Sequence, residues 1–282
     1  MTHGTTLTLP TIAILGAGSM GRAILSGLLA PEVQVSGGIR VTNRSVERAA
    51  ELADIDGVTS FATAGDPDAN RRAVDGAAIV LVAVKPAMVV DLLDEIAGSL
   101  ADGTVVVSVA AGVTSATFES RLPASVSVVR SMPNTPAVVG RAVTGVSGGS
   151  RSSEDELALV RRLFETVGVV IEVPESQLDA LSTISGSGPA YVFYLIEQLT
   201  ATAVEKGFTP EQAALMVDDT FVGAAELLRQ SGRTPSELRR QVTSPNGTTE
   251  RAIAVLESAG LKQTFDAATD AALARARELA GA

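Results

Sequence analysis

The sequence of 282 residues has no cysteine, no tryptophan and a single histidine, His3. Without cysteine the chain cannot form a disulfide, a Cys–His zinc site or a cysteine nucleophile. His3 lies in a polar segment over residues 1–10, which we expect to form a flexible leader. A histidine general base or a Ser–His–Asp triad is therefore not expected, and neither is a metal site.

Long hydrophobic runs and basic clusters are also missing. No apolar stretch reaches the roughly 18 residues that a membrane-spanning helix needs. No basic segment followed by an apolar one marks a secretory signal. The 22 Lys and Arg residues against 32 Asp and Glu give a net charge of −10, without a basic block. Since nucleic-acid binding needs clustered Lys and Arg, we expect a cytoplasmic protein that binds neither nucleic acid nor a membrane.

Short, continuous apolar runs alternate with amphipathic patterns over residues 11–173. The runs predict these buried strands: Thr11–Leu15, Ile39–Thr42, Ala78–Val84, Thr104–Val109, Ser125–Val129, Ala142–Val146 and Val167–Val173. The clearest helices between them are Ser45–Ala53, Pro86–Leu100 and Ser153–Thr166. Continuous rather than alternating strands, separated by helices, are typical of a mainly parallel sheet covered on both faces. The predicted fold class is α/β, with an N-terminal Rossmann-like, doubly wound sheet.

Residues 174–282 contain no further strand-like run and are predicted to form an all-helical C-terminal domain. Thr209-Pro210 and Thr234-Pro235 each follow a glycine, a pattern that ends one helix and caps the next. Predicted helices such as Ala190–Ala203 and Ala213–Leu228 are apolar over wide arcs. Such helices need burial on more than one side, so we expect this domain to form a homodimer.

A glycine motif follows the first predicted strand and opens the helix Ser19–Leu29. In a dinucleotide site, Gly16 permits the tight turn, Gly18 lets a pyrophosphate approach the backbone, and Gly21 allows close helix–strand packing. The helix N-terminus supplies N–H donors and a favourable dipole. A tight strand–helix turn without a ligand is the alternative. The whole motif is Gly16, Ala17, Gly18, Ser19, Met20 and Gly21.

The end of the second strand indicates which dinucleotide binds. An NAD site usually has an acidic residue there, whereas this chain has Asn43, Arg44 and Ser45, and the nearest acid is Glu47. Donors and a guanidinium suit a 2′-phosphate, so NADPH is predicted, with NADH possible. Alternatively, this is an exposed turn in which Ser45 caps the next helix.

Other candidate residues follow later strands, where ligands of open parallel sheets bind. Lys85 lies between Val84 and Pro86 at the end of the strongest run, although a solvated lysine is an equal alternative. Ala110 and Ala111 are small enough for a nicotinamide ring to lie against the backbone. Two prolines stiffen the loop Met132–Pro136.

Two polar segments interrupt the helices of the second domain, Ser185–Ala190 and Ser244–Thr249. Each presents free N–H groups and hydroxyls that could hold a carboxylate, although helix breaks often serve only to reverse the chain.

Taken in order, these motifs resemble the pyrroline-5-carboxylate reductase family over nearly the whole chain. The resemblance rests on GAGSMG at 16–21, AVKP at 83–86, AAG at 110–112, MPNTP at 132–136, SGSGPAY at 185–191 and SPNGTT at 244–249. It implies reduction of the cyclic imine 1-pyrroline-5-carboxylate to L-proline by NAD(P)H. It also implies a helical dimer with the active site at its interface, often assembled into a decamer.

The resemblance assigns roles to individual residues. Thr249 corresponds to the family threonine whose hydroxyl reaches the ring nitrogen, and Lys85 is the second candidate catalytic residue. The substrate loop is Ser244, Gly247, Thr248 and Thr249. The cofactor site is Gly16 to Gly21, Asn43, Arg44, Ser45, Asn70, Val84, Lys85, Pro86, Ala110 and Ala111.

The chain departs from the family in three places. Asn246 stands where the family usually has a glycine, and asparagine tolerates positive φ better than most residues. The region before Asn70 is longer than usual. Ala78 replaces a common acidic residue, with no consequence that we can derive.

The resemblance implies hydride transfer to the imine carbon, for which the protein mainly positions the substrate. Three alternatives remain open: a related imine reductase, a β-hydroxyacid dehydrogenase and a non-catalytic NADP-sensing dimer. The hydroxyacid dehydrogenases usually place a catalytic lysine just after the domain boundary, and Leu178–Tyr191 contains none.

Overall fold

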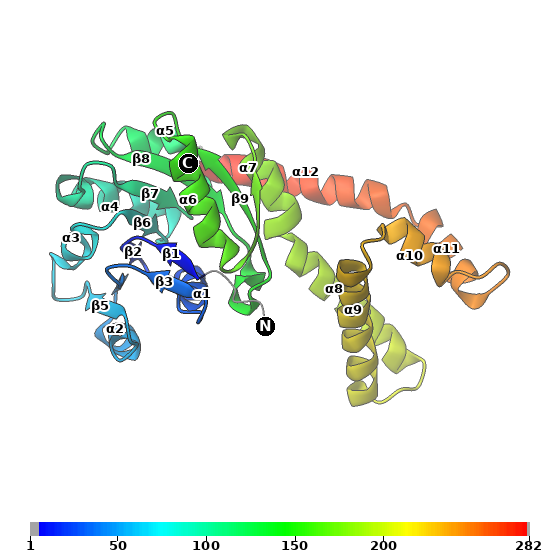
Figure 1. The fold of residues 1–282 in the computed structure, drawn as a ribbon. Coiled ribbons are helices and arrows are strands. Elements are labelled where there is room, and N and C mark those ends of the chain that lie inside the picture. Colours follow the sequence, from blue (N-terminus) through cyan, green and yellow to red (C-terminus); the bar gives the residue numbers. More distant parts are fainter. Residues whose placement is uncertain (1–5, 281–282) are drawn as a thin grey trace. The chain divides into compact units, whose positions relative to one another are not determined.

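The computed structural model describes residues 6–280, and His3 lies outside them. The chain divides into two compact units. The first comprises the chain up to Ser187 together with the C-terminal end from Leu273, and the second comprises Gly188–Ala272. Figure 1 shows the strands in the first unit and helices alone in the second.

An eight-stranded sheet forms the centre of the first unit. Its strands, in spatial order, are β10 (Gly168–Glu172), β9 (Ala142–Gly148), β8 (Ser127–Met132), β7 (Val105–Ser108), β6 (Ile79–Val82), β2 (Ile12–Leu15), β4 (Ile39–Asn43) and β5 (Val58–Ala62). All neighbours are parallel except β8 and β9, which are antiparallel. From β2 the chain builds outward first to β4 and β5, then on the other side from β6 to β8. This is the strand order of a doubly wound dinucleotide-binding sheet, so the predicted fold class is confirmed.

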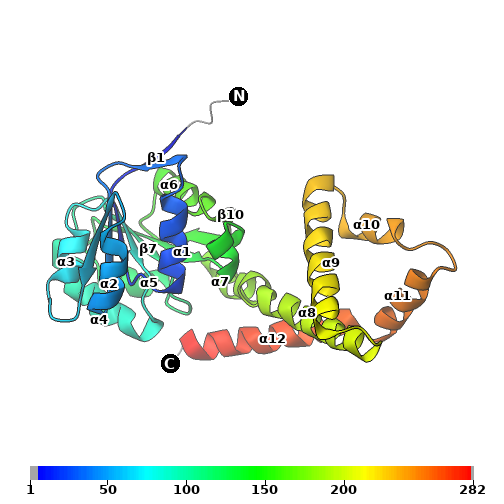
Figure 2. The ribbon, with the colours of Figure 1, turned by 90° about the horizontal axis from the view of Figure 1, so that it is seen from below.

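Both faces of the sheet are covered, because successive side chains of each strand point to opposite sides. Ile12 and Ile14 of β2 belong to one apolar cluster, and Ala13 and Leu15 belong to the other. Helices flank the sheet on both faces (Figure 2). The first cluster contains apolar residues of α1 (Ser19–Leu28), α2 (Val46–Ala53) and α6 (Glu154–Glu165). The second contains those of α3 (Ala69–Val74), α4 (Val89–Ile96) and α5 (Ser115–Glu119).

The N-terminal segment differs from the predicted flexible leader. Leu7–Leu9 forms β1, which pairs in parallel with β3 (Val33–Val35) in a separate two-stranded sheet. Leu9 is fully buried in the first apolar cluster. A strand of three residues is too short to show an apolar period, and for that reason the sequence pattern does not reveal it.

The second unit begins after a π-helical turn. α7 (Glu175–Leu181) runs into the π-turn Ser182–Gly186, and α8 (Gly188–Glu205) follows. The remaining helices are α9 (Pro210–Ser231), α10 (Pro235–Gln241), α11 (Thr248–Ser258) and α12 (Leu261–Ala280), of which the part from Leu273 belongs to the first unit. From Glu175 to Ala280 the structure contains helices and no strand, as predicted.

The predicted helix caps are present in this unit. Thr209 and Thr234 each accept a hydrogen bond from the backbone N–H three residues later, with a proline at the first helical position. Both caps are closed reciprocally, because the side chain of the third helical residue, Gln212 or Glu237, accepts from the backbone N–H of the capping threonine. Gly232 ends α9 in the left-handed conformation, with φ of +64°.

The two compact units meet later in the chain than the predicted boundary at 173–174. Residues 175–187 belong to the first unit. Leu178 of α7 is fully buried, and a Cβ placed on Gly145 of β9 would lie 2.9 Å from its Cδ2. α7 therefore packs directly on the sheet, which a change from strands to helices in the sequence cannot reveal.

Candidate active site

The predicted cofactor motifs lie at one edge of the sheet, with a single exception. The glycine motif follows β2, Asn43–Ser45 follows β4, Val84–Pro86 follows β6 and Ala110–Ala111 follows β7. These four strands are parallel and adjacent in the sheet. Their carboxyl ends therefore form one crevice edge, where ligands of such sheets bind.

Each of the three positions in the first motif requires or favours glycine for a different structural reason. Gly16 has φ of +92°, and a Cβ on it would lie 2.9 Å from Val84 Cγ1. A Cβ on Gly21 would lie 2.7 Å from the carbonyl oxygen of Gly16, so helix α1 can pack there only without a side chain. A Cβ on Gly18 would meet nothing within 4 Å. The backbone at Gly18 is thus open to a ligand, as the motif predicts.

The turn is held by the neighbouring strand and opens onto free donors. The backbone N–H groups of Gly16 and Ala17 donate to the carbonyl of Thr42, at 3.2 and 2.9 Å. Helix α1 begins after Gly18 without a side-chain cap and without an acidic residue in its first turn. The first N–H groups of the helix, including those of Ser19 and Met20, therefore have no acceptor within the helix, and together with the helix dipole they can bind an anion.

The segment after β4 forms the predicted helix cap and also leaves polar groups available for a ligand. Ser45 caps helix α2 by accepting from Arg48 N at 3.3 Å, and the Arg44 side chain is exposed beside it. Asn43 is only 5% exposed, and its Nδ2 has no hydrogen-bond partner in the structure. A buried, unpaired donor at the carboxyl end of β4 fits a polar ligand.

The segment after β6 places a lysine at the crevice edge. Lys85 is exposed, and its carbonyl accepts from Met88 N at 2.9 Å, closing a short 3-10 turn that begins at Pro86. The proline fixes the first position of this turn, and Lys85 precedes it in extended conformation.

Buried serines tie the ends of β7 and β8 together and hold the segment after β7. Ser131 Oγ donates to the carbonyl of Ser108 at 2.7 Å, and Ser108 Oγ accepts from Ala110 N at 3.3 Å. Ala110 is buried, whereas Ala111 is exposed. The turn that carries the two alanines therefore has a fixed backbone.

Asn70 is the exception among the predicted cofactor residues. It lies in the first turn of α3 (Ala69–Val74), and its Nδ2 donates to Glu95 Oε2 at 3.2 Å. Glu95 lies near the C-terminus of α4, seven residues after Met88, the last residue of the 3-10 turn that follows Lys85. The structure thus directs the Asn70 amide toward α4, against which α3 packs, and its role at the cofactor stays a prediction.

The predicted substrate loop lies in the helical unit and is described by itself. Gly247 N donates to Ser244 O at 3.0 Å, and α11 begins at Thr248 without a side-chain cap. Asn246 has φ of +58° and is the one non-glycine residue with positive φ in the described chain. The loop thus needs the left-handed conformation where Asn246 replaces the family glycine, and asparagine supplies it. The first N–H groups of α11, including that of Thr249, have no acceptor within the helix, and at the same end the Glu250 carboxylate accepts from Asn246 N at 2.8 Å.

Comparisons with known proteins show the same two-part organisation. The family described as pyrroline-5-carboxylate reductase dimerisation matches residues 175–279. The family described as NADP oxidoreductase coenzyme F420-dependent matches residues 11–112. A pyrroline-5-carboxylate reductase of Corynebacterium melassecola is 41% identical over 95% of this chain and 98% of its own length. This chain belongs to the pyrroline-5-carboxylate reductase family.

Further members are similar over comparable lengths. The reductase of Pseudomonas aeruginosa is 36% identical over 96% of this chain and 97% of its own. The solved structure of the pyrroline-5-carboxylate reductase from Coxiella burnetii is 36% identical, with a TM-score of 0.87 over 98% of this chain and 99% of that one. The Plasmodium falciparum reductase, solved with NADP bound, shares the fold at 24% identity, with a TM-score of 0.78 over 96% of this chain and 98% of that one.

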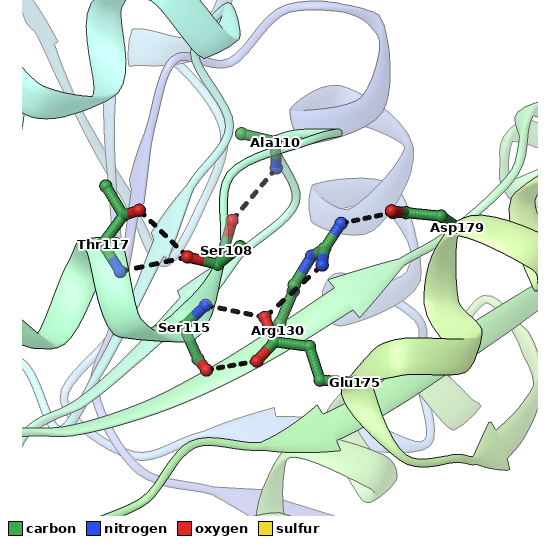
Figure 3. A network of polar contacts seen from close by, with 8 residues as sticks. Ser108, Ala110, Ser115, Thr117, Arg130, Glu175 and Asp179 are labelled. Atoms are coloured by element: carbon green, nitrogen blue, oxygen red, sulfur yellow. Dashed lines mark hydrogen bonds and ion pairs between the residues drawn. The ribbon is translucent and has the colours of Figure 1, made fainter. Parts of the chain in front are cut away.

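One polar cluster at the crevice of this reductase-family chain was not predicted from the sequence. Ser115, Arg130, Glu175 and Asp179, here named the α7 cluster, come from α5, β8 and α7 (Figure 3). The available signal was Arg130, a single charge inside an otherwise uncharged strand, Ser127–Met132. A charge in such a strand requires a buried partner, but nothing in the sequence identifies which acid supplies it.

Residues 6–280 offer no group of three His, Cys, Asp or Glu side chains arranged to hold a metal ion. No helix in the same range combines the length and the hydropathy that a membrane span requires.

Proposed function

We propose that this protein reduces 1-pyrroline-5-carboxylate to L-proline with NADPH, the last step of proline biosynthesis. The observation that carries the proposal is the open N-terminus of α1 at Gly18, in a chain that is 41% identical to a named reductase along almost its entire length. The cyclic imine and the reduced nicotinamide are the substrate and cofactor of that family.

The crevice edge fits a dinucleotide. The backbone of the glycine turn, Gly16 to Gly21, holds the pyrophosphate, and Asn43, Arg44 and Ser45 hold the adenosine side. NADPH is favoured because an exposed guanidinium and hydroxyl, rather than an acid, follow β4. Val84, Lys85, Pro86, Ala110 and Ala111 border the nicotinamide half. The solved relative from Plasmodium falciparum binds NADP, which supports this choice of cofactor.

The substrate is held by the loop before α11. Its carboxylate accepts from the N–H groups that begin α11 and from the Ser244 hydroxyl, with Gly247 leaving the backbone accessible. The Thr249 hydroxyl hydrogen-bonds the ring nitrogen and keeps the C=N bond oriented. Bound NADPH supplies a hydride to the imine carbon, and the nitrogen keeps its proton as the double bond becomes single. Because a protonated imine is already electrophilic, orientation is the main task of these residues.

The protein acts as a homodimer formed by the helical unit, with the substrate loop completing an active site at the dimer interface, and the dimers assemble further into a decamer. Support comes from the family match to a dimerisation region and from the exposed apolar side chains of α8 and α9. The cytoplasmic location stays a prediction.

The test is NADPH oxidation with 1-pyrroline-5-carboxylate, compared with a panel of hydroxy- and keto-acids. We expect turnover of the imine alone. NADPH binding without turnover of any compound would instead indicate a sensing dimer. Replacing Thr249 with alanine should lower kcat/KM by about 10²-fold, the effect of losing an orienting or proton-donating group. The matched control is Thr264→Ala in α12. It removes a hydroxyl that donates to Gly260 O, and it should leave kcat/KM unchanged.

Full activity of Thr249→Ala with normal KM would show that Thr249 has another role. The same assay with NADH in place of NADPH measures the cofactor preference.

A further inference from the structure

The α7 cluster is built around a buried guanidinium. The Arg130 side chain is only 4% exposed, and it donates to Asp179 Oδ1 at 2.8 Å and to Glu175 Oε1 at 3.4 Å. Its Nε has no partner. Arg130 pairs in register with Ser108, the last residue of β7, so the guanidinium lies level with the crevice edge. Ionic groups buried in this way give little net stability compared with apolar residues of the same volume.

Glu175 connects this guanidinium to the loop after β7. Its carboxylate accepts from Ser115 N at 2.7 Å and from Ser115 Oγ at 2.5 Å (Figure 3). Ser115 is the first residue of α5 and follows Ala111 by four residues, after the Thr114 cap. The carboxylate therefore fixes the end of the segment 109–114, which includes both alanines of the proposed nicotinamide site.

The same part of the chain holds the loop after β8. Asn134 Nδ2 donates to Ser185 O at 2.9 Å in the π-turn, and Asn134 Oδ1 accepts from Val143 N at 2.9 Å. Asn134 is buried, and its loop begins three residues after Arg130. Residues 175–187 are thus bonded at one end to the loop after β7 and at the other end to the loop after β8.

We propose that Glu175 and Arg130 are positioning residues for the reaction, because they set the segment 109–114 and the segment 182–187, which contains the π-turn, in one fixed arrangement at the crevice edge. The proposal rests on the proposed function, in which 109–114 borders the nicotinamide. Neither side chain touches the reacting atoms. Their effect passes through the backbone of two segments, one after β7 and one after α7.

The chain offers a matched control on the same helix. Glu119, the last residue of α5, accepts from Ser150 Oγ at 2.7 Å and from Arg151 N at 3.3 Å. It is also a carboxylate that joins α5 to another loop through one hydroxyl and one backbone N–H. Because α5 begins after the crevice-edge segment and ends at Glu119, this second carboxylate lies away from that segment.

The experiment compares Glu175→Gln with Glu119→Gln in the full-length protein. Amide hydrogen exchange should rise by about tenfold in both 109–114 and 182–187 for Glu175→Gln, the loss of one charge-assisted bond. Glu119→Gln should leave both segments unchanged. In steady-state assays, kcat of Glu175→Gln should fall by about tenfold while KM for NADPH changes by less than about threefold, because orientation and not phosphate binding is lost.

Hydrogen exchange separates this inference from the proposed function. If the wild type does not reduce the imine, the proposed function fails, and exchange in the two segments still decides whether the cluster fixes them. An increase in one segment alone, an unchanged kcat or an equal loss in Glu119→Gln would each overturn the proposal. If Glu175→Gln does not fold, Ser115→Ala removes one hydroxyl bond and keeps the ion pairs. It should give changes of the same kind, about threefold in size.

Discussion

The two units of the molecule differ in how they bury their apolar side chains. The first unit covers both faces of its sheet and encloses large side chains such as Phe118 and Phe164 completely. In the described residues 188–272, by contrast, the buried apolar side chains are Ala203, Ala213 and Val217. Phe193, Leu215 and many other large apolar residues of α8 to α12 are exposed.

This difference teaches that the two units obtain their stability from different sources. A unit with an enclosed core is stable as a single chain, whereas large exposed apolar surface marks an interaction site. Because the family match covers the helical unit and describes dimerisation, a second copy of the chain is the expected cover. Stability of the first unit should then be independent of protein concentration, and that of the second should depend on it.

The largest expected effect comes from a charge placed on the helical unit. Phe193 of α8 is 66% exposed. Phe193→Asp should weaken the dimer by about 10⁴-fold or more, since symmetry buries an unpaired charge on each side of the interface. Analytical ultracentrifugation measures the change. Val46→Asp, at a residue 57% exposed in the first unit, should leave the dimer intact. Equal dissociation by both variants would show that the units do not differ.

The next effect concerns the enclosed core. Leu93 of α4 is fully buried, and Leu93→Ala should cost about 2 to 5 kcal/mol by leaving a cavity. Thermal unfolding should show the same loss at every protein concentration. Leu215→Ala in the helical unit should lower stability only where the dimer forms. A concentration-dependent effect of Leu93→Ala would contradict the comparison.

A smaller effect is expected in cofactor selection by the first unit. Arg44→Ala should raise KM for NADPH about tenfold, because one charge-assisted bond to the 2′-phosphate is lost, and leave KM for NADH unchanged. The control is Arg121→Ala, which breaks an exposed ion pair with Asp94. Equal effects on both cofactors would exclude a role of Arg44 in recognising the phosphate.

The strained residue of the substrate loop gives an effect of about 1 kcal/mol. Asn246 has φ of +58°, so Asn246→Ala should destabilise the loop by that amount, which is the cost of the left-handed conformation. Asn246→Gly should stay close to the wild type. Chemical denaturation of the dimer measures both. A neutral Asn246→Ala would show that the loop changes its backbone readily.

The smallest effect is the pH dependence of helix caps in the two units. Burial raises the pKa of Glu156. Hydrogen bonds from the Ser153 backbone and hydroxyl and from Ser127 together lower it by more, so the net shift of this pKa is downward. A lowered folded-state pKa adds stability above the ordinary carboxyl pKa and loses it as pH falls through the folded value. Glu156→Gln should therefore cost about 0.5 kcal/mol at pH 7 and nothing in strong acid.

In the helical unit, hydrogen bonds from the Thr234 backbone and hydroxyl lower the pKa of Glu237. Glu237→Gln should therefore also lower stability at pH 7 and have no effect in strong acid. Thermal scans between pH 3 and 7 compare the two variants, and a cost of either that grows in acid would contradict the assignment.

Sequence patterns predict the fold where one physical signal dominates. The long strands are continuous apolar runs because both faces are buried, and β2, β4 and β6 lie within a few residues of their predicted bounds. β1, β3 and β5 were missed, since three to five residues with polar members give no clear period. The antiparallel pairing of β8 and β9 is set by tertiary packing and has no local signal.

The candidate site also divides into features with a local sequence signal and features set by tertiary packing. The tight turn predicted at Gly16 and the close packing predicted at Gly21 are confirmed by the structure, because each depends on the backbone within a single turn. The approach of a pyrophosphate at Gly18 stays a prediction. The α7 cluster could not be predicted, since Ser115 and Glu175 lie 60 residues apart and meet only when α7 packs on the sheet. The side chain of Asn70 was placed by motif order, whereas its direction depends on the packing of α3 against α4.

The interior position of β2 has a consequence for folding. Ile12 pairs with Ile39 on one side and with Ile79 on the other, so the earliest strand of the main sheet is an interior strand. During synthesis β2, β4 and β5 can associate early, but the five strands on the other side of β2 have no place to attach until β6 leaves the ribosome. Such non-local parallel pairing slows folding and leaves one edge of β2 unpaired meanwhile. A destabilised β6 would therefore prolong the time in which the nascent chain can aggregate.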